Sequence, residues 1–89
     1  MIRIPHKDLP KYLADYCRHQ QEPVLIQQEN ELWQLAFQPA DVGFPFNKYF
    51  AVVENQAETA SFTMNHWMSI LQESGVDCVK MDLRKRSLK

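Results

Sequence analysis

The side chains of this chain that could bind a metal ion or attack a substrate are three histidines and two cysteines: His6, His19, His66, Cys17 and Cys78. A structural zinc site needs four such ligands in two closely spaced pairs, whereas here Cys17 and His19 form the single close pair. Cys78 and His66 have the chemistry of a nucleophile and its base. However, a cysteine in an apolar run is usually a small core residue, and no glycine-rich oxyanion element stands nearby. We therefore predict no catalytic residue and no metal ligand.

The composition excludes several classes of protein. Hydrophobic residues make up 45% and charged residues 24% of the 89 residues, which is typical of a folded domain and not of a disordered segment. The two glycines do not build a phosphate-binding loop or a dinucleotide fingerprint, so we expect no cofactor. The apolar runs are too short for a membrane span or a signal peptide. We expect one domain over residues 1–89, in the cytoplasm, with reduced thiols and no membrane partner.

Charge is segregated along the chain, although the formal net charge is -1. Residues 19–79 contain eight acidic side chains and one lysine, whereas residues 1–18 and 80–89 together contain nine basic and three acidic side chains. The basic ends, including the tail 84–89, have the charge needed to contact phosphate, and the acidic middle has the charge needed to contact a basic groove. A surface of mixed charge is the alternative, because separation along the sequence does not require separation in space.

Apolar periodicity predicts the elements of the first half of the chain. Residues 1–4 are typical of a short strand, and apolar side chains recur at helical spacing over about residues 9–20. Two strand-like runs, 24–26 and 32–37, flank a polar stretch in which Asn30 can adopt a left-handed conformation. We therefore expect a strand, a helix and a β-hairpin in this order.

A second group of elements completes the domain. Residues 49–54 have strand propensity and lead through a turn into a further short strand. Thr63 is a suitable N-cap for a helix over about residues 64–74, which Gly75 would end. A helix start near Glu58 is the alternative.

A last strand is predicted over residues 76–81. The expected fold is therefore a small single α+β domain. It contains two helices and a mixed or antiparallel sheet of four to six strands.

Residues 39–48 have the composition of a loop, with two prolines and one of the two glycines. The loop is unusually aromatic, and aromatic side chains within a polar rim are typical of interaction hot spots. A loop that folds back over a small core is the alternative. The candidate protein-binding residues are the loop aromatics and acids of the middle segment: Phe44, Phe46, Tyr49, Glu29, Glu31, Glu54 and Glu58.

A longer pattern runs through about the first forty residues. It comprises Ile4 at a strand end, Asp8-Leu9, Leu13 and Tyr16 in the helix, Pro23, Val24 and Ile26 in the first hairpin strand, and Trp33 to Phe37 in the second. This pattern resembles the Phd/YefM family of antitoxins. The resemblance implies a dimer that binds operator DNA with its N-terminal region and a toxin with a C-terminal segment. Carried over to this chain, the DNA contacts would be Arg3, His6, Lys7 and Lys11.

These features lead to two hypotheses of non-enzymatic, stoichiometric binding. The first is an antitoxin-like repressor that binds a partner toxin and operator DNA, as a homodimer because a thin core often depends on an oligomer interface. The second is a phage or mobile-element inhibitor or immunity-type protein, anti-CRISPR-like, whose acidic surface blocks a nucleic-acid-processing enzyme. A small enzyme that uses Cys78 or His66 is the third alternative.

Overall fold

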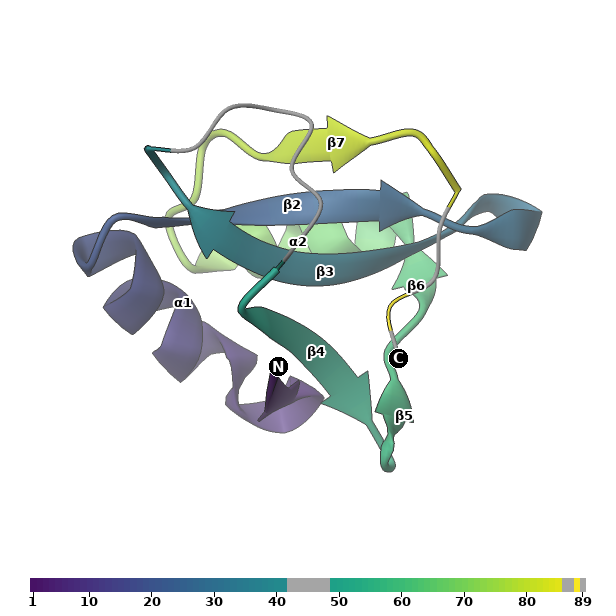
Figure 1. Cartoon of the computed structure of the whole chain (residues 1–89), viewed down its shortest axis with the longest axis horizontal. Coiled ribbons are helices and arrows are strands. Elements are labelled where there is room, and N and C mark those ends of the chain that lie inside the picture. The colour runs from purple at the N-terminus through teal and green to yellow at the C-terminus, as the bar shows by residue number, and fades with distance from the viewer. Residues whose placement is uncertain (42–48, 86–87, 89) are drawn as a thin grey trace.

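The computed structural model describes residues 1–41, 49–85 and 88. The elements in chain order are β1 (Ile2–Pro5), the 3-10 turn η1 (His6–Asp8), α1 (Leu9–Arg18), β2 (Gln21–Gln27), the turn η2 (Glu29–Glu31), β3 (Leu32–Pro39), β4 (Ala51–Asn55), β5 (Glu58–Thr59), β6 (Phe62–Thr63), α2 (Met64–Glu73) and β7 (Lys80–Asp82) (Figure 1). The predicted α+β class is confirmed, with two α-helices among the described residues. Neither of these helices has the length and hydrophobicity required to cross a membrane.

The described strands form one mixed sheet in the order β1-β4-β3-β2-β7 (Figure 1). The antiparallel β2–β3 hairpin is its centre, and every residue of β2 has a partner in β3. β4 pairs antiparallel with β3, whereas β1 pairs parallel with β4 and β7 pairs parallel with β2. The short segments β5 and β6 pair with β4 and β3 and bring the described strands to seven. β1 and β7 are therefore the two edges of the sheet.

Both helices cover the same face of the sheet, and the main core lies between the helices and the strands. Leu25 and Phe37, which point to this face, belong to one cluster with Leu13 of α1 and Trp67 of α2. Trp67 is fully buried and donates a hydrogen bond from its indole Nε1 to the carbonyl oxygen of Trp33, at 2.7 Å. Because a buried indole N–H needs an acceptor, this bond holds α2 against β3.

The opposite face of the sheet carries a smaller core made of Val24, Ile26, Ala36, Val52 and Tyr49, with Leu88 packed against it. The backbone of Leu88 is anchored at both of its polar groups. Its N–H donates to Oε1 of Gln34 at 3.0 Å, and its carbonyl accepts from the hydroxyl of Thr59 at 2.6 Å. The tail expected at residues 84–89 thus returns to the sheet at Leu88, although Arg86, Ser87 and Lys89 lie outside the described residues.

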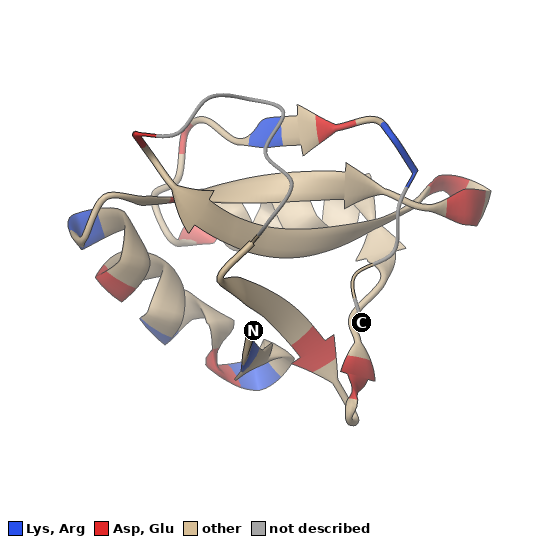
Figure 2. Ribbon diagram, viewed as in Figure 1, with Lys and Arg blue, Asp and Glu red and all other residues tan. Residues whose placement is uncertain are grey.

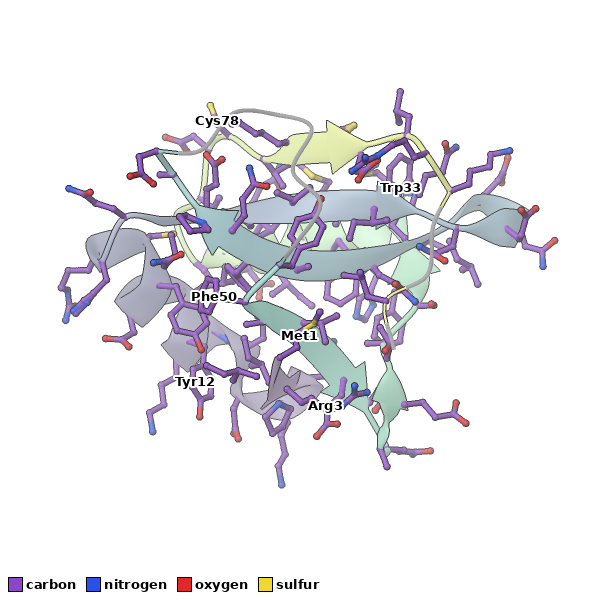
Figure 3. All side chains as sticks on the ribbon, viewed as in Figure 1. Met1, Arg3, Tyr12, Trp33, Phe50 and Cys78 are labelled. Atoms are coloured by element: carbon purple, nitrogen blue, oxygen red, sulfur yellow. The ribbon has the colours of Figure 1, made fainter. Side chains whose placement is uncertain are left out.

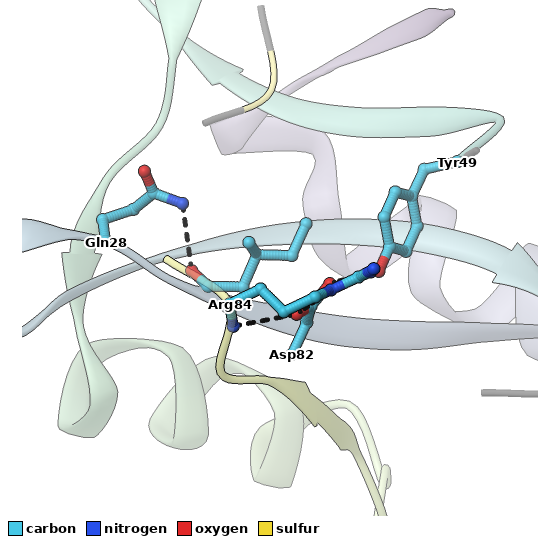
Figure 4. A network of polar contacts seen from close by, with 5 residues as sticks. Gln28, Tyr49, Asp82 and Arg84 are labelled. Carbon is cyan, nitrogen blue, oxygen red and sulfur yellow. Dashed lines mark hydrogen bonds and ion pairs between the residues drawn. The ribbon is translucent and has the colours of Figure 1, made fainter. Parts of the chain in front are cut away.

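Asp82 joins β7 to this second core through a partly buried polar network (Figure 4). Its carboxylate accepts hydrogen bonds from the Tyr49 hydroxyl at 3.2 Å and from the guanidinium of Arg84 at 2.6 and 2.8 Å. The backbone N–H of Arg84 donates a further bond to it at 3.0 Å. These bonds from Arg84 lower the pKa of Asp82 to about 2, although its burial acts in the opposite direction. Asp82 is therefore a buried carboxylate that stays ionised at neutral pH.

Several predicted element boundaries need correction. α1 ends at Arg18 rather than near residue 20, because Gln20 turns the chain with a φ of 59° before β2 begins. The alternative helix start near Glu58 is wrong, since residues 58–59 and 62–63 pair with β4 and β3. Thr63 is the N-cap of α2, as predicted, and its hydroxyl accepts from the N–H of His66.

The last strand is also shorter than predicted. It covers Lys80–Asp82 and not residues 76–81. Val76 is held at the end of α2 by a hydrogen bond from its N–H to the carbonyl of Leu71, at 2.9 Å. Val79 packs against the main core, so this stretch returns the chain from α2 to the sheet before the strand begins.

Two left-handed backbone positions allow a matched stability test. Ala57, in the two-residue turn between β4 and β5, has a φ of 67°, and Gly75, after α2, has a φ of 79°. In this conformation a Cβ costs about 1–2 kcal/mol. Replacement by glycine recovers only part of this free energy, because glycine also raises the conformational entropy of the unfolded chain. We expect Ala57→Gly to raise the free energy of unfolding by about 0.5–1 kcal/mol.

Gly75→Ala should lower the same quantity by a similar amount, since a Cβ there meets nothing within 4 Å and its cost is purely conformational. Urea denaturation at neutral pH measures both variants. A loss of stability in Ala57→Gly would contradict the turn geometry.

The Asp82 network predicts a specific response to acid. Because the pKa of Asp82 lies below its unfolded value of 3.8, its carboxylate stabilises the fold above about pH 4, and this stabilisation is lost as the pH falls toward 2. The contribution is on the order of 2 kcal/mol. In Asp82→Asn, the fall in unfolding free energy between pH 4 and pH 2 should be smaller than in the parent by about this amount. Denaturation curves over this range test it, with Asp77→Asn as an exposed control; equal pH dependence in the parent and Asp82→Asn would refute the prediction.

Candidate functional site

The structure brings together five of the site residues predicted from the sequence, at the end of the molecule where β1 and η1 meet the β4–β5 hairpin. These are Arg3, His6, Lys7, Glu54 and Glu58. The parallel pairing of β1 with β4 sets Pro5 opposite Glu54, and the β4–β5 turn sets Asn55 opposite Glu58. Two segments about fifty residues apart in sequence therefore form one surface.

An ion pair at the centre of this surface joins a predicted DNA contact to a predicted protein contact. The Nε of Arg3 donates to Oε2 of Glu54 at 2.8 Å, and its Nη2 reaches the hydroxyl of Thr59 at 3.5 Å. Both charged side chains remain partly exposed, at 34% and 25%. Arg3 is consequently a neutralised cation, which is a weaker phosphate contact than the sequence alone indicated.

A depression of about 290 Å³ lies beside this ion pair and is lined by Pro5, His6, Lys7, Glu54, Asn55 and Gln56. Gln56 forms part of its rim from the strained turn, where its φ is 53°. Non-glycine residues in this conformation persist where the surrounding structure over-determines them, and such residues are common at binding sites. The depression has room for one side chain of a partner molecule.

The start of the chain adds two exposed apolar side chains at this edge of the sheet, which point to opposite faces because side chains alternate along a strand. Met1 is 58% and Ile2 is 53% exposed, which places them among the most exposed large hydrophobic residues that the structure describes. Figure 3 shows Met1 and Arg3 together at this end of the molecule. We call the complete set the β1-edge surface: Met1, Ile2, Arg3, His6, Lys7, Glu54, Asn55, Gln56 and Glu58.

His6 connects this surface to α2 through a second histidine. Its Nε2 lies 3.0 Å from Nε2 of His66, so one ring donates a hydrogen bond and the other accepts it. Phe62 stacks against His66 with ring centroids 4.1 Å apart, and Trp67 meets both imidazoles at its edge. Partial burial, together with the nearby charge of His66, lowers the pKa of His6. This shift favours the neutral form of His6.

Sequence reasoning did not anticipate this pair. The helical position of His66 follows from the N-cap at Thr63, but no local signal relates it to a histidine sixty positions earlier. The ring of His66 pairs with His6, and Cys78, which the sequence analysis considered as a nucleophile beside His66, is an exposed free thiol. The expectation that Cys78 is a core residue is wrong because residues 76–79 connect α2 to β7 outside the sheet. Among the described residues, no three His, Cys, Asp or Glu side chains gather as metal ligands.

The remaining candidate residues lie elsewhere. Glu29 and Glu31 occupy the η2 turn, which projects away from the β4–β5 hairpin (Figures 1 and 2). Lys11 is exposed on α1, and Tyr49 is 5% exposed in the second core, where it supports Asp82 rather than presenting a contact surface. Phe44 and Phe46 lie outside the described residues. The candidate acids therefore do not form one acidic surface.

Ion pairs cancel much of the charge segregation seen along the sequence. Acids of the middle segment bind bases from the ends of the chain in two of the described pairs: Glu54 with Arg3 and Glu22 with Lys80, each at 2.8 Å. Figure 2 shows acidic and basic residues interspersed over the ribbon. The folded surface is thus of mixed charge, which is the alternative considered from the sequence.

Comparison with known proteins adds no family to this description. No protein-family model, no curated protein and no solved structure matches the chain. The resemblance of the N-terminal residues to Phd/YefM antitoxins accordingly stays a prediction, and a function must be inferred from the geometry of the chain itself.

Proposed function

We propose that the protein is a small non-enzymatic regulator that acts by stoichiometric binding of a partner protein through the β1-edge surface. The observation that carries this proposal is an open strand edge with two exposed apolar side chains, Met1 and Ile2, beside a rim of charged residues. An apolar centre within a polar rim is the usual anatomy of a protein interface.

The open edge of β1 supplies the backbone part of this interaction. Among the described residues β1 pairs with β4 alone, so the N–H and C=O groups along its outer side have no strand partner. An exposed strand edge is a template for an added strand, in which main-chain hydrogen bonds give affinity and side-chain pockets give specificity. The depression lined by His6 and Lys7 lies next to this edge and fits the role of such a pocket.

The charge of the surface favours protein over nucleic acid as the partner. It carries two basic side chains, Arg3 and Lys7, and two acidic ones, Glu54 and Glu58. Phosphate backbones are bound by an excess of positive charge, which this surface lacks. Complementary mixed charges give specificity in protein interfaces.

Two classes of partner remain from the sequence analysis, a toxin and a nucleic-acid-processing enzyme. The acids Glu29 and Glu31 are exposed in the η2 turn, which favours a basic protein in either class. The exposed thiols Cys17 and Cys78 support a location in the reducing cytoplasm, where such partners act.

Site-specific crosslinking tests where the partner binds. A photo-crosslinking residue at Ile2 should give one defined heteromeric adduct in the native host, because this side chain lies at the centre of the proposed interface. The matched control is Leu83, which is 64% exposed near the other edge of the sheet. An adduct from Leu83 and none from Ile2 would contradict the proposal, and an adduct of the chain with itself would assign this edge to dimerisation.

Variants of the same two positions then test the energetics. With the purified partner, Ile2→Arg should weaken binding at least about tenfold, a loss of roughly 1.4 kcal/mol, because it places a charge in the apolar centre. Leu83→Arg should leave the affinity unchanged, and isothermal titration calorimetry measures both. Equal loss in the two variants would indicate a general effect of charge or stability rather than a contact at β1.

An antitoxin-like repressor would in addition bind DNA, and one observation supports a separate surface for it. Lys11 and Arg18 are exposed on the same side of α1, and neither makes an ion pair with another described residue. Their spacing places them within a narrow arc of the helical surface. Asp8 and Asp15 on the same helical segment reduce the net charge, which makes DNA binding the second candidate function.

Fluorescence polarisation with duplex DNA tests this second surface. If it binds, the salt dependence of affinity should lose about one unit of log–log slope in each of Lys11→Gln and Arg18→Gln, since each variant removes one phosphate contact. Lys85→Gln, in the tail, is the control. Unchanged slopes in the helix variants would exclude this face as the DNA contact.

A further inference from the structure

The two histidines between η1 and α2 meet through their ring nitrogens. His6 and His66 place their Nε2 atoms 3.0 Å apart. The ring planes are inclined by 28°. Both residues are half-buried, so one side of the pair is accessible to solvent. The depression that His6 lines adds a route to bulk water.

The distance between the two nitrogens suits a shared metal ion. Imidazole nitrogens bind transition metals at about 2.0–2.1 Å, so two such bonds that span 3.0 Å enclose an angle of about 95° at the metal. This angle is close to that between neighbouring ligands in tetragonal and octahedral complexes, which Cu²⁺ and Ni²⁺ prefer over tetrahedral ones. The ion would lie beside the line between the nitrogens, so each ring would turn by about 40° to point its lone pair at it, a change that the broad χ2 torsion of histidine permits.

Phe62 and Trp67 pack against the two imidazole rings and hold them in place. Neutral imidazole is the form that binds metal ions. In the neutral pair one Nε2 carries the proton of the hydrogen bond. When a metal ion binds, this proton moves through solvent to Nδ1 of the same ring, so both Nε2 lone pairs become free and no net proton is lost.

We propose that His6 and His66 form a two-imidazole binding site for a divalent transition-metal ion, with Cu²⁺ preferred, in which water completes the coordination. The chemistry of two nitrogen ligands predicts that affinity rises from Co²⁺ through Ni²⁺ to Cu²⁺ and falls again at Zn²⁺. Hard cations such as Mg²⁺ prefer oxygen ligands and should not bind. The site links η1 to the first turn of α2, so an occupied site would strengthen the contact between the β1-edge surface and the main core.

Tryptophan fluorescence of the intact chain provides a direct test, with CuCl₂ as the probe. The ring centroid of Trp67 lies 6.0 Å from that of His6 and 5.8 Å from that of His66, so a bound Cu²⁺ ion should quench its emission. In a background of Trp33→Phe, Cys17→Ser and Cys78→Ser, Trp67 is the sole indole and no thiol competes. We expect quenching that saturates at one equivalent of Cu²⁺.

Histidine variants in this background distinguish the site from adventitious binding. Loss of a residue that hydrogen-bonds to a metal ligand weakens metal binding about 10–100-fold. His6→Gln and His66→Gln each remove a ligand itself, so each variant should bind Cu²⁺ more weakly by at least this factor. His19→Gln, an exposed histidine after α1, should bind Cu²⁺ like the parent. His66→Phe retains an aromatic ring against Phe62 and serves as a second variant, with circular dichroism to confirm that each protein is folded.

NMR of the parent chain gives a result that does not depend on any variant. With diamagnetic ZnCl₂, the ring resonances of His6 and His66 should shift and those of His19 should not. Equal quenching in the parent and in the His6 and His66 variants, or a zinc-induced shift confined to His19, would overturn the proposal.

Discussion

The parallel pairing of β1 with β4 is the constraint on which the proposed functional surface depends. Through this pairing the first residues of the chain lie beside residues about fifty positions later, and Arg3 comes within 2.8 Å of Glu54. The chain then turns directly from β1 into η1, which carries His6 to α2. Without this pairing the ion pair, the depression and the histidine pair would have no common location.

A second consequence of the fold is that charges separated along the sequence meet in space. The ends of the chain become the outer strands β1 and β7, and the acidic middle supplies the strands next to them. Arg3 therefore pairs with Glu54 at one edge, and Lys80 pairs with Glu22 at the other. Exposed pairs of this kind contribute little to stability, about 0–1 kcal/mol each. Their main effect is on recognition, since they convert two oppositely charged regions into surfaces of mixed charge.

Local sequence signals predicted much of the fold. The β2–β3 hairpin followed from two apolar runs around Asn30, whose φ is 60°, and the limits of α2 followed from Thr63 and Gly75. Long-range features could not be predicted in this way. Periodicity carries no information about which strands pair in parallel, so the β1–β4 contact and the meeting of His6 with His66 had no local signal. Tyr49 shows the same limit, because it is buried against Val24 and Ile26 and bonded to Asp82, all of them distant in the sequence.

Hydrogen exchange of the backbone amides in β1 and β4 tests the central claim most directly. In the isolated protein, the amides of β1 that face β4, such as that of Ile2, which donates to the carbonyl of Phe50 at 2.8 Å, should exchange more slowly than an unstructured peptide. The amides of β4 should show comparable protection. Exchange of the β1 amides at the rate of a free peptide, with β2 and β3 still protected, would show that β1 does not pair with β4. The β1-edge surface and the histidine pair would then lose their common structural basis.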